Sequence, residues 1–174
     1  QANYDIESWG VAGSFPLSRA IPGAENVCLN KSGSSEPALA ENDGWDGAWY
    51  DVTTPGQGFL VDVMPNTAGD DFIFVAWFTY GEDSTSGQRW LTAEGSLNGT
   101  TAEIPVYETT GGSFDDPKAT ETAVVGSMNI EFIDCTSALV TYSLTDDDLA
   151  GSIDIKRAIP GAEALCQELH GLND

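Results

Sequence analysis

The feature that most constrains the fold is an internal duplication shorter than a domain. Residues 4–28 align with residues 142–166 without a gap, at a constant offset of 138 positions. The run Arg-Ala-Ile-Pro-Gly-Ala-Glu is identical in the two copies, at 19–25 and 157–163. Positions that differ keep their apolar type: Ile6/Leu144, Val11/Leu149, Phe15/Ile153, Leu17/Ile155 and Val27/Leu165. Each copy is predicted to be a strand, a turn, a strand and a Pro-Gly stop, and such a hairpin is marginal in water unless it joins a larger sheet.

The first copy precedes a complete domain and has no sheet of its own. We therefore divide the chain into an N-terminal arm at 1–30, a polar linker at 31–43 and a β domain at 44–174. Unpaired strand edges recruit partners, which leaves three arrangements open. First, the arm can fold back onto its own domain. Second, it can insert into a neighbouring subunit, or displace the equivalent hairpin of that subunit, which then docks onto the next subunit. Third, the arm can be the remnant of a longer tandem array. Head-to-tail exchange that does not close into a ring builds filaments.

The β domain is predicted to be all-β, with eight antiparallel strands in meander order. Alternating apolar stretches between turn residues place the strands at 47–53, 57–64, 72–80, 88–95, 100–108, 122–134, 138–145 and 151–158. Residues 72–78 are apolar on both faces, which indicates a central strand. Asn98-Gly99 predicts a tight hairpin turn, and Pro105 a bulge or a sheet edge, because proline has no N–H for a ladder. An up-and-down barrel and a two-sheet sandwich both fit, and a short helix is expected at 162–170.

Charge and composition exclude several classes of function. The 174 residues carry 28 acids against 6 bases, a net charge of −22, which repels phosphate backbones and argues against a nucleic-acid partner. No apolar run approaches the roughly 18 residues of a spanning helix, so membrane insertion is not expected. The 41% apolar content supports a buried core. The chain starts at Gln1 and no signal-peptide pattern follows, which favours a processed, secreted protein, extracellular or at the cell surface.

The three cysteines predict a disulfide and leave its pairing open. Cys28 and Cys166 are equivalent in the duplication, and Cys135 precedes the seventh strand. A self-contained domain would join Cys135 to Cys166, whereas an arm docked in the equivalent position would join Cys28 to Cys135 and free Cys166. The spacing matches no zinc motif, and an oxidising compartment is the expected setting. The partner of Cys135 therefore reports which hairpin completes the domain.

Catalysis has little support in the sequence. His170 is the only histidine and lies close to the C-terminus, and neither a nucleophile elbow nor a phosphate-binding glycine loop is present. Glu94, Glu103 and Glu108 offer carboxylates for a glycosidase pair, but surface carboxylates often form such pairs by accident. We expect no enzyme activity and no cofactor.

Two short clusters of acidic residues raise calcium as the one alternative. They comprise Asp115, Asp116, Asp146, Asp147 and Asp148, all in predicted turns. Carboxylate oxygens are the ligands that calcium prefers, although neither cluster has the spacing of an EF-hand loop. A solvated acidic surface explains the same residues without a metal.

The tryptophans allow two interpretations. Trp49, Trp77 and Trp90 fall on neighbouring predicted strands, where they can fill the core or form a platform on which sugar rings stack. Trp9 occupies the position of Asp147 in the duplication, and a tryptophan in place of an acid indicates an interface anchor.

Several motifs of the β domain also occur together in a known kind of module. They are Gly47-Ala48-Trp49-Tyr50, Pro55-Gly56-Gln57-Gly58-Phe59, Ala76-Trp77-Phe78-Thr79-Tyr80, Arg89 to Gly95 and Tyr107 to Gly112. Across residues 44–158 the chain resembles an uncharacterised module of secreted bacterial proteins, often in tandem, with the pattern G-x-W-Y, G-Q-G-F, W-F-T-Y and W-L-T. The resemblance implies a secreted β module and carries no activity over. Residues 47–50 are also similar to a segment of avidin-type barrels, from which no biotin site maps.

Together these features predict a secreted, non-catalytic structural subunit that assembles through its arm. In strand addition, main-chain hydrogen bonds supply affinity, and side chains such as Ile6, Phe15 and Leu17 set the register by filling apolar slots. The expected partner is a second copy of the chain, in a homo-oligomer or a head-to-tail filament. A carbohydrate-binding module that uses Trp49, Trp77 or Trp90 is the alternative.

Overall fold

The computed structural model describes most of the chain, in two compact units. The described residues are 1–17, 44–64, 70–81, 87–114, 116, 118–145 and 148–170. One unit combines Gln1–Ala38 with Gly112–Lys118, and the other combines Leu39–Gly111 with Ala119–Asp174. The predicted linker at 31–43 lies outside the described residues.

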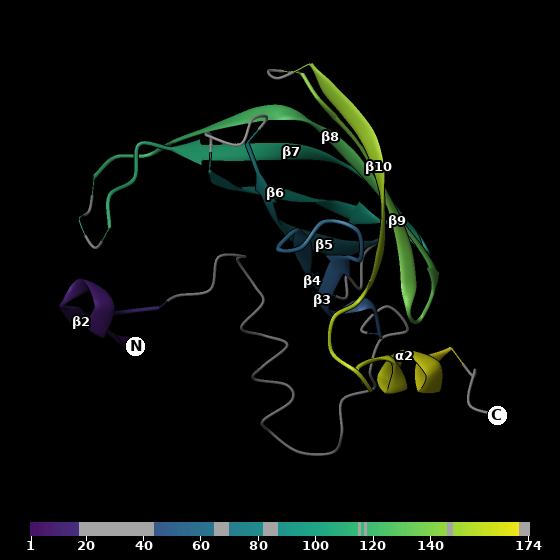
Figure 1. Cartoon of the computed structure of the whole chain (residues 1–174). Coiled ribbons are helices and arrows are strands. Elements are labelled where there is room, and N and C mark those ends of the chain that lie inside the picture. Colours follow the sequence, from purple (N-terminus) through teal and green to yellow (C-terminus); the bar gives the residue numbers. More distant parts are fainter. Residues whose placement is uncertain are drawn as a thin grey trace. The chain divides into compact units, whose positions relative to one another are not determined.

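The larger unit is an antiparallel β barrel followed by one short helix (Figure 1). Its elements are β3 (Gly47–Asp51), β4 (Gly58–Met64), β5 (Asp71–Tyr80), β6 (Gln88–Leu97), β7 (Thr101–Thr110), β8 (Glu121–Asp134), β9 (Ser137–Leu144), β10 (Leu149–Arg157) and α2 (Glu163–Leu169). The predicted strands and helix are confirmed, with boundaries that differ by three residues or fewer.

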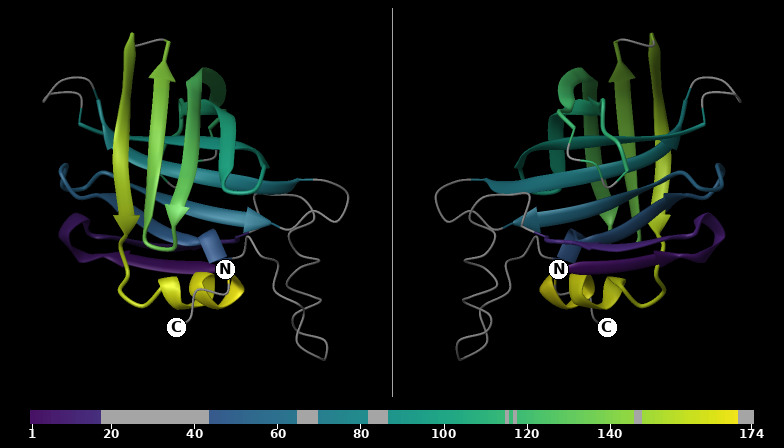
Figure 2. Two further views of the ribbon diagram at one scale, coloured as in Figure 1. Left: turned by 90° about the vertical axis from the view of Figure 1, so that its right-hand side faces the viewer. Right: turned by 90° about the vertical axis from the view of Figure 1, so that its left-hand side faces the viewer.

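Closure of the sheet decides between the two predicted architectures. Each strand from β3 to β10 pairs with the next, and β10 also pairs with β3 over Ile155↔Asp51, Lys156↔Tyr50 and Arg157↔Trp49. The sheet is therefore a closed up-and-down barrel and not a two-sheet sandwich. Both views of Figure 2 show the closed sheet, with α2 across one end. Closure leaves the barrel without an edge strand.

Period-two alternation fills the barrel interior. In β4 the buried residues are Phe59, Val61 and Val63, and in β8 and β9 the same alternation buries Ile130 and Val140. Pro105 lies in β7 one residue before a register shift at Val106/Tyr107, so the predicted irregularity is present. Small barrels of eight strands are filled by side chains in this manner. The predicted hairpin turn forms at Asn98 and Thr101, whose main chains exchange two hydrogen bonds.

One arginine at the end of β10 joins several segments at the base of the barrel. The guanidinium of Arg157 donates to the main-chain oxygens of Cys135 and Asp46, each at 2.7 Å, and to that of Gly44. Its Cζ lies 4.4 Å from the centroid of the Trp49 ring. Burial lowers the pKa of Arg157. The residue that starts the seven-residue duplicated run therefore fastens β10 to β3 and to the β8–β9 turn.

A disulfide joins the same turn to α2. Cys135 and Cys166 are bonded, and both are buried. Of the pairings that the sequence leaves open, the self-contained one is present, so the C-terminal hairpin occupies the closing position of this barrel. Cys28 lies outside the described residues.

The smaller unit contains a two-stranded sheet. β1 (Ala2–Ile6) and β2 (Val11–Phe15) are antiparallel and joined by the 3-10 turn η1 (Glu7–Trp9). The face that carries Ala2, Tyr4 and Ile6 is half-buried, and the opposite face is exposed. The arm predicted from the duplication thus forms the expected hairpin.

We predict that the disulfide contributes about 3 kcal/mol to the free energy of unfolding, since it closes a loop with a sequence separation of 31 residues. The change is Cys166→Ala in a Cys28→Ser background, so that Cys135 cannot find a second partner. Urea unfolding under non-reducing conditions, against Cys28→Ser alone, measures the difference. Equal midpoints and slopes in the two variants would contradict the prediction.

Candidate functional site

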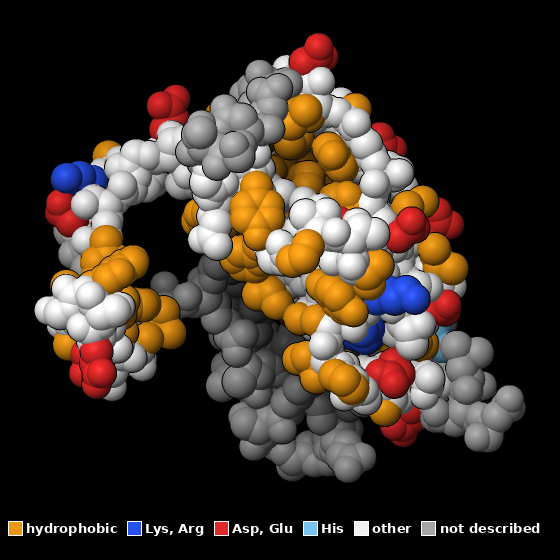
Figure 3. Space-filling view, viewed as in Figure 1, with side chains coloured by type: hydrophobic (Ala, Val, Ile, Leu, Met, Phe, Trp, Pro, Cys, Tyr) orange, Lys and Arg blue, Asp and Glu red, His pale blue; other side chains and the backbone are white. Residues whose placement is uncertain are grey.

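The barrel opens at the end of β10 that lies away from Arg157. A cavity of about 290 Å³ is present there, lined on one side by apolar side chains that include Trp77, Tyr142, Leu144 and Leu149. Figure 3 shows a hollow in the barrel with hydrophobic side chains inside it. We call this cavity the mouth. Strand alternation explains its lining, because these side chains continue the inward-facing rows of the core toward open solvent.

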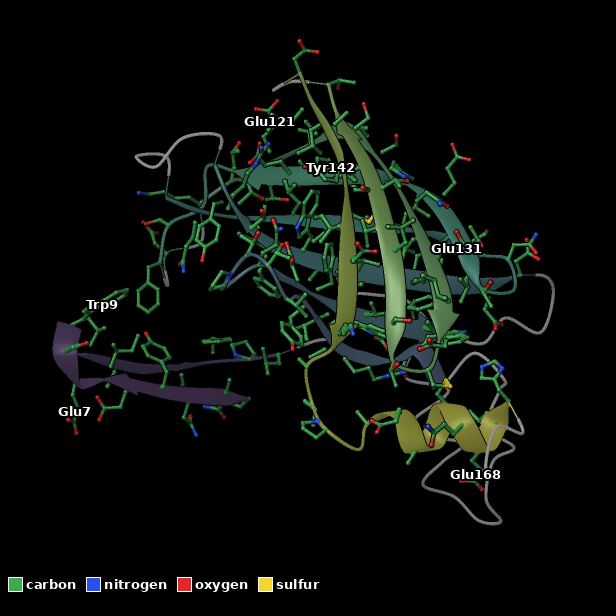
Figure 4. The ribbon with its side chains drawn as sticks, turned by 45° about the vertical axis from the view of Figure 1, so that its right-hand side comes forward. Glu7, Trp9, Glu121, Glu131, Tyr142 and Glu168 are labelled. Atoms are coloured by element: carbon green, nitrogen blue, oxygen red, sulfur yellow. A yellow bond between two sulfur atoms is a disulfide. The ribbon has the colours of Figure 1, made fainter. Side chains whose placement is uncertain are left out.

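Aromatic rings form the floor of the mouth. The Trp77 ring centroid lies 5.0 Å from that of Tyr142 and 5.5 Å from that of Phe59. Tyr142 extends from β9, as Figure 4 shows. The buried indole N–H of Trp77 finds no hydrogen-bond partner among the described residues. A buried donor without a partner costs free energy, and Trp77 is among the residues that line the mouth.

Polar residues occupy the other side of the mouth. Arg89 donates to both carboxylate oxygens of Glu108, at 2.7 and 3.1 Å, so its charge is neutralised by a bidentate ion pair. Thr79 donates to the amide oxygen of Gln57 at 2.5 Å, and the amide nitrogen of Gln57 donates to Asp51 at 2.9 Å. The side chains on this side are hydrogen-bonded, Arg89 is paired, and the nearby Asp51 carboxylate adds a negative charge, which suits a neutral ligand better than an anion.

Asp51 anchors this network from the end of β3. Burial alone would raise the pKa of its carboxyl, but hydrogen bonds from the hydroxyl and main chain of Thr53 and from Gln57 outweigh burial and lower the pKa from 3.8 to about 2. The carboxylate is therefore ionised whenever the network is intact, and it holds the loop between β3 and β4 at the mouth.

The N-terminal hairpin reproduces the β9–β10 hairpin pair by pair. All five residue pairs of β1 and β2 recur in β9 and β10 at the offset of 138; Tyr4 opposite Gly13, for example, becomes Tyr142 opposite Gly151. The tyrosine covers the glycine in both hairpins: a Cβ on Gly13 would meet the Tyr4 hydroxyl at 2.6 Å, and one on Gly151 would meet the Tyr142 hydroxyl at 2.9 Å. The two hairpins therefore share one register and one side-chain arrangement.

The turns of the two hairpins agree as well. Gly10 has φ of 65°, and its equivalent Asp148 has φ of 53° and is the one residue other than glycine with positive φ in the described part of the chain. The left-handed region costs aspartate less than most residues, but more than glycine. The two hairpins therefore share the left-handed conformation at this turn position.

Phe114 lies on the face of the arm hairpin that corresponds to the barrel interior. Its ring meets those of Tyr4 and Trp9 edge-on, at centroid distances of 5.5 and 6.4 Å. A tight turn, in which the Asp116 N–H donates to the Ser113 oxygen at 3.3 Å, presents the ring, which is still 60% exposed. Sequence reasoning missed Phe114; its signal is a lone large apolar residue in a stretch of turn formers.

The predicted tryptophan platform needs correction. Trp49 and Trp77 are 1% and 2% exposed, because alternation in β3 and β5 turns them into the barrel, whereas Trp90 points outward and is 56% exposed. A surface that combines all three is therefore wrong. Trp90 instead lies opposite Phe78, in a row that continues through Gly58 to Tyr50 across four strands.

The other predicted site residues fall into two groups. Trp9, Phe15 and Leu17 of the arm are exposed, as an interface needs; Figure 4 shows Trp9 at the hairpin turn. Among the acidic residues, Asp115, Asp146 and Asp147 lie outside the described residues. The Asp116 carboxylate is 3.2 Å from the Lys118 ammonium group. Within the described ranges, no group of three or more potential metal ligands converges.

The comparisons with protein-family models, with curated proteins and with solved structures found no match to this chain. In the part of the chain that the structure describes, none of the helices combines the length and the apolar character that crossing a membrane requires.

The lowered pKa of Asp51 predicts a pH dependence of stability. A carboxyl whose pKa falls on folding stabilises the fold above its unfolded value, and this contribution is lost as pH drops. We expect the free energy of unfolding of the wild-type chain to decrease from about pH 4 to pH 2, through the interval between 3.8 and about 2, and Asp51→Asn to show a weaker decrease. Urea titrations between pH 4 and pH 2 measure the free energy of unfolding of each chain. Asp62→Asn, which removes an exposed carboxylate of β4, should keep the wild-type slope; equal slopes in all three chains would contradict the assignment.

Proposed function

We propose that this chain is a non-catalytic, secreted structural subunit that assembles head to tail, and that its N-terminal hairpin closes a barrel of the same kind in a neighbouring unit. The observation that carries the proposal is the shared register of β1–β2 and β9–β10. A hairpin that repeats the pairing, the covered glycine and the turn of the closing hairpin meets the steric demands of the same position. An extracellular or cell-surface location accords with the disulfide and with the acidic surface.

Docked in that position, the arm would make a defined set of contacts. β1 would take the place of β9 beside β8, and β2 the place of β10 beside β3. Tyr4 would take the position of Tyr142, opposite Met128. Leu17 would take the position of Ile155, opposite Asp51. The apolar side chains that the arm leaves exposed would fill the barrel, and main-chain ladders on both sides would supply affinity.

The duplicated run supports the same position. Arg157, at its start, joins β3, the β8–β9 turn and the segment before β3 through three main-chain oxygens. Arg19 is its sequence equivalent, and Cys28 that of Cys166. An arm that never closed a barrel would have no use for these two residues at this spacing, so their presence favours docking of the whole segment and not of the strands alone.

Exchange leaves the number of strand pairs unchanged, since one hairpin leaves the closing position as the other enters. The equilibrium between closure by the chain's own hairpin and closure by the arm of a neighbour then depends on the disulfide and on the linkers. The Cys135–Cys166 bond favours the chain's own hairpin, whereas a Cys28–Cys135 bond between chains would favour the arm. Oxidation before or after docking selects between the two.

We predict that the whole chain, reduced, unfolded and oxidised at high protein concentration, forms species larger than a monomer that contain a Cys28–Cys135 bond between chains. Ile6→Glu places a charge on the inward-type face of the arm and should abolish these species. Ala12→Glu, on the exposed face of β2, is the matched control and should retain them. Light scattering gives the mass, and peptide mapping of differently labelled chains gives the bond. Monomers with Cys135–Cys166 alone in every preparation would overturn the proposal.

A second candidate function is carbohydrate binding on the outer face of the barrel. The observation that favours it is the exposed pair Phe78 and Trp90 on neighbouring strands, beside a hollow of about 360 Å³. Indole and phenyl faces pack well against the C–H faces of sugars.

For this candidate we predict that Trp90→Ala weakens binding to any glycan found on an array by about tenfold. Trp9→Ala removes a tryptophan of the arm that is even more exposed and should leave binding unchanged. Quenching of tryptophan fluorescence by the glycan measures both. Equal losses in the two variants, or no glycan bound, would remove the candidate.

A further inference from the structure

We propose that the mouth of the barrel is a binding site for the Phe114 turn of a second copy of this chain. The inference rests on the proposed association of copies of this chain, but not on exchange of their hairpins. It gives the mouth a peptide ligand: an aromatic side chain at the tip of a tight turn.

The arm hairpin reveals the ligand because it duplicates one wall of the mouth. Tyr142, Leu144 and Leu149 form the β9–β10 part of the lining. Their equivalents in the arm are Tyr4, Ile6 and Val11, in the same register. Phe114 lies against Tyr4 on this face. The structure therefore already contains a copy of the wall with a Phe114 ring seated on it.

The chemistry of the remaining walls fits the same ring. Outside the duplicated wall, Trp77 adds a second aromatic ring to the lining, 5.0 Å from that of Tyr142, and edge-to-face contacts between such rings are favourable. Phe114 is large, apolar and 60% exposed, so its transfer into the mouth removes a costly surface from water. The Phe114 turn also brings main-chain carbonyl groups, and one of these can accept from the orphaned Trp77 N–H.

The local turn exposes the ring. Ser113 and Asp116 pair across the turn that carries Phe114, and the ring is 60% exposed there. A ring that is already held by a turn loses less freedom on binding than one on a free segment. Charge opposes the association, because each copy carries a net −22, so binding should strengthen as salt screens the repulsion.

The consequence for assembly is a second contact between neighbours, made by the turn of one unit in the mouth of the next. The geometry also separates two states of the receiving barrel. When it is closed by its own hairpin, Phe114 meets Leu149 and Tyr142; when it is closed by the arm of the neighbour, Phe114 keeps the contact with Tyr4 that this chain already shows. The loop between β3 and β4, with Thr54 on the mouth, is common to both states.

A disulfide trap between two variants of the whole chain tests the proposal. Ser113→Cys, which keeps the Phe114 ring, is mixed with Thr54→Cys, each in a Cys28→Ser background, and oxidised at moderate salt. We expect a cross-linked heterodimer on non-reducing gels. The matched control is Leu60→Cys, on the exposed outer face of β4, which should cross-link at the lower rate of random collision. Equal rates for Thr54→Cys and Leu60→Cys would overturn the site.

A third mixture distinguishes this proposal from hairpin exchange. A bond from Ser113→Cys to Leu149→Cys means that the receiving barrel keeps its own hairpin, so the mouth is correct even if exchange fails. A bond to Thr54→Cys without one to Leu149→Cys supports both proposals. In addition, Phe114→Ala should weaken association of the otherwise unmodified chain roughly 30-fold, as loss of a central aromatic anchor does. Phe78→Ala, an exposed aromatic of the outer face, should not, and equal effects of the two would contradict the site.

Discussion

The structure depends on one seam, the pairing of β10 with β3. Eight antiparallel strands become a barrel only when the last strand pairs with the first, and here the seam has three residue pairs. Such a short ladder is reinforced at the base, where Arg157 binds three main-chain oxygens and covers the Trp49 ring. The disulfide from the β8–β9 turn to α2 fastens the same end. The base is consequently fixed, whereas the mouth at the other end stays open and carries a cavity.

Much of the barrel could be predicted from the sequence because its strands alternate in hydrophobicity and end at turn residues. The strand positions, the turn after Asn98 and the irregularity near Pro105 all follow from local rules. Closure could not be predicted, because alternation says which face of a strand is buried but not that β3 meets β10, about a hundred residues later in the chain. The tryptophans show the same limit: the motifs drew attention to Trp49 and Trp77, yet only the phase of each strand decides that both lie inside.

The candidate site was predicted in part. The duplication indicated the arm hairpin and its apolar face, and the structure gives this hairpin the register of β9–β10. The duplication did not indicate the mouth, because Trp77, Tyr142 and Leu149 come from strands far apart in the sequence and meet only in the closed barrel. Phe114 was missed for a related reason. A single phenylalanine among turn residues acquires a meaning only through the ring that it contacts.

The cysteine in the middle of α2 has a consequence for the lifetime of any assembly. While Cys135 and Cys166 are separate, the closing hairpin is held by hydrogen bonds and packing, which open and re-form readily. Once the two sulfurs are joined, Cys135 can bond the arm of a neighbour only after a slow thiol exchange. A unit in that condition cannot bond a neighbouring arm without this exchange, so the length of any chain of units would reflect the order of docking and oxidation and not the concentration of subunits afterwards.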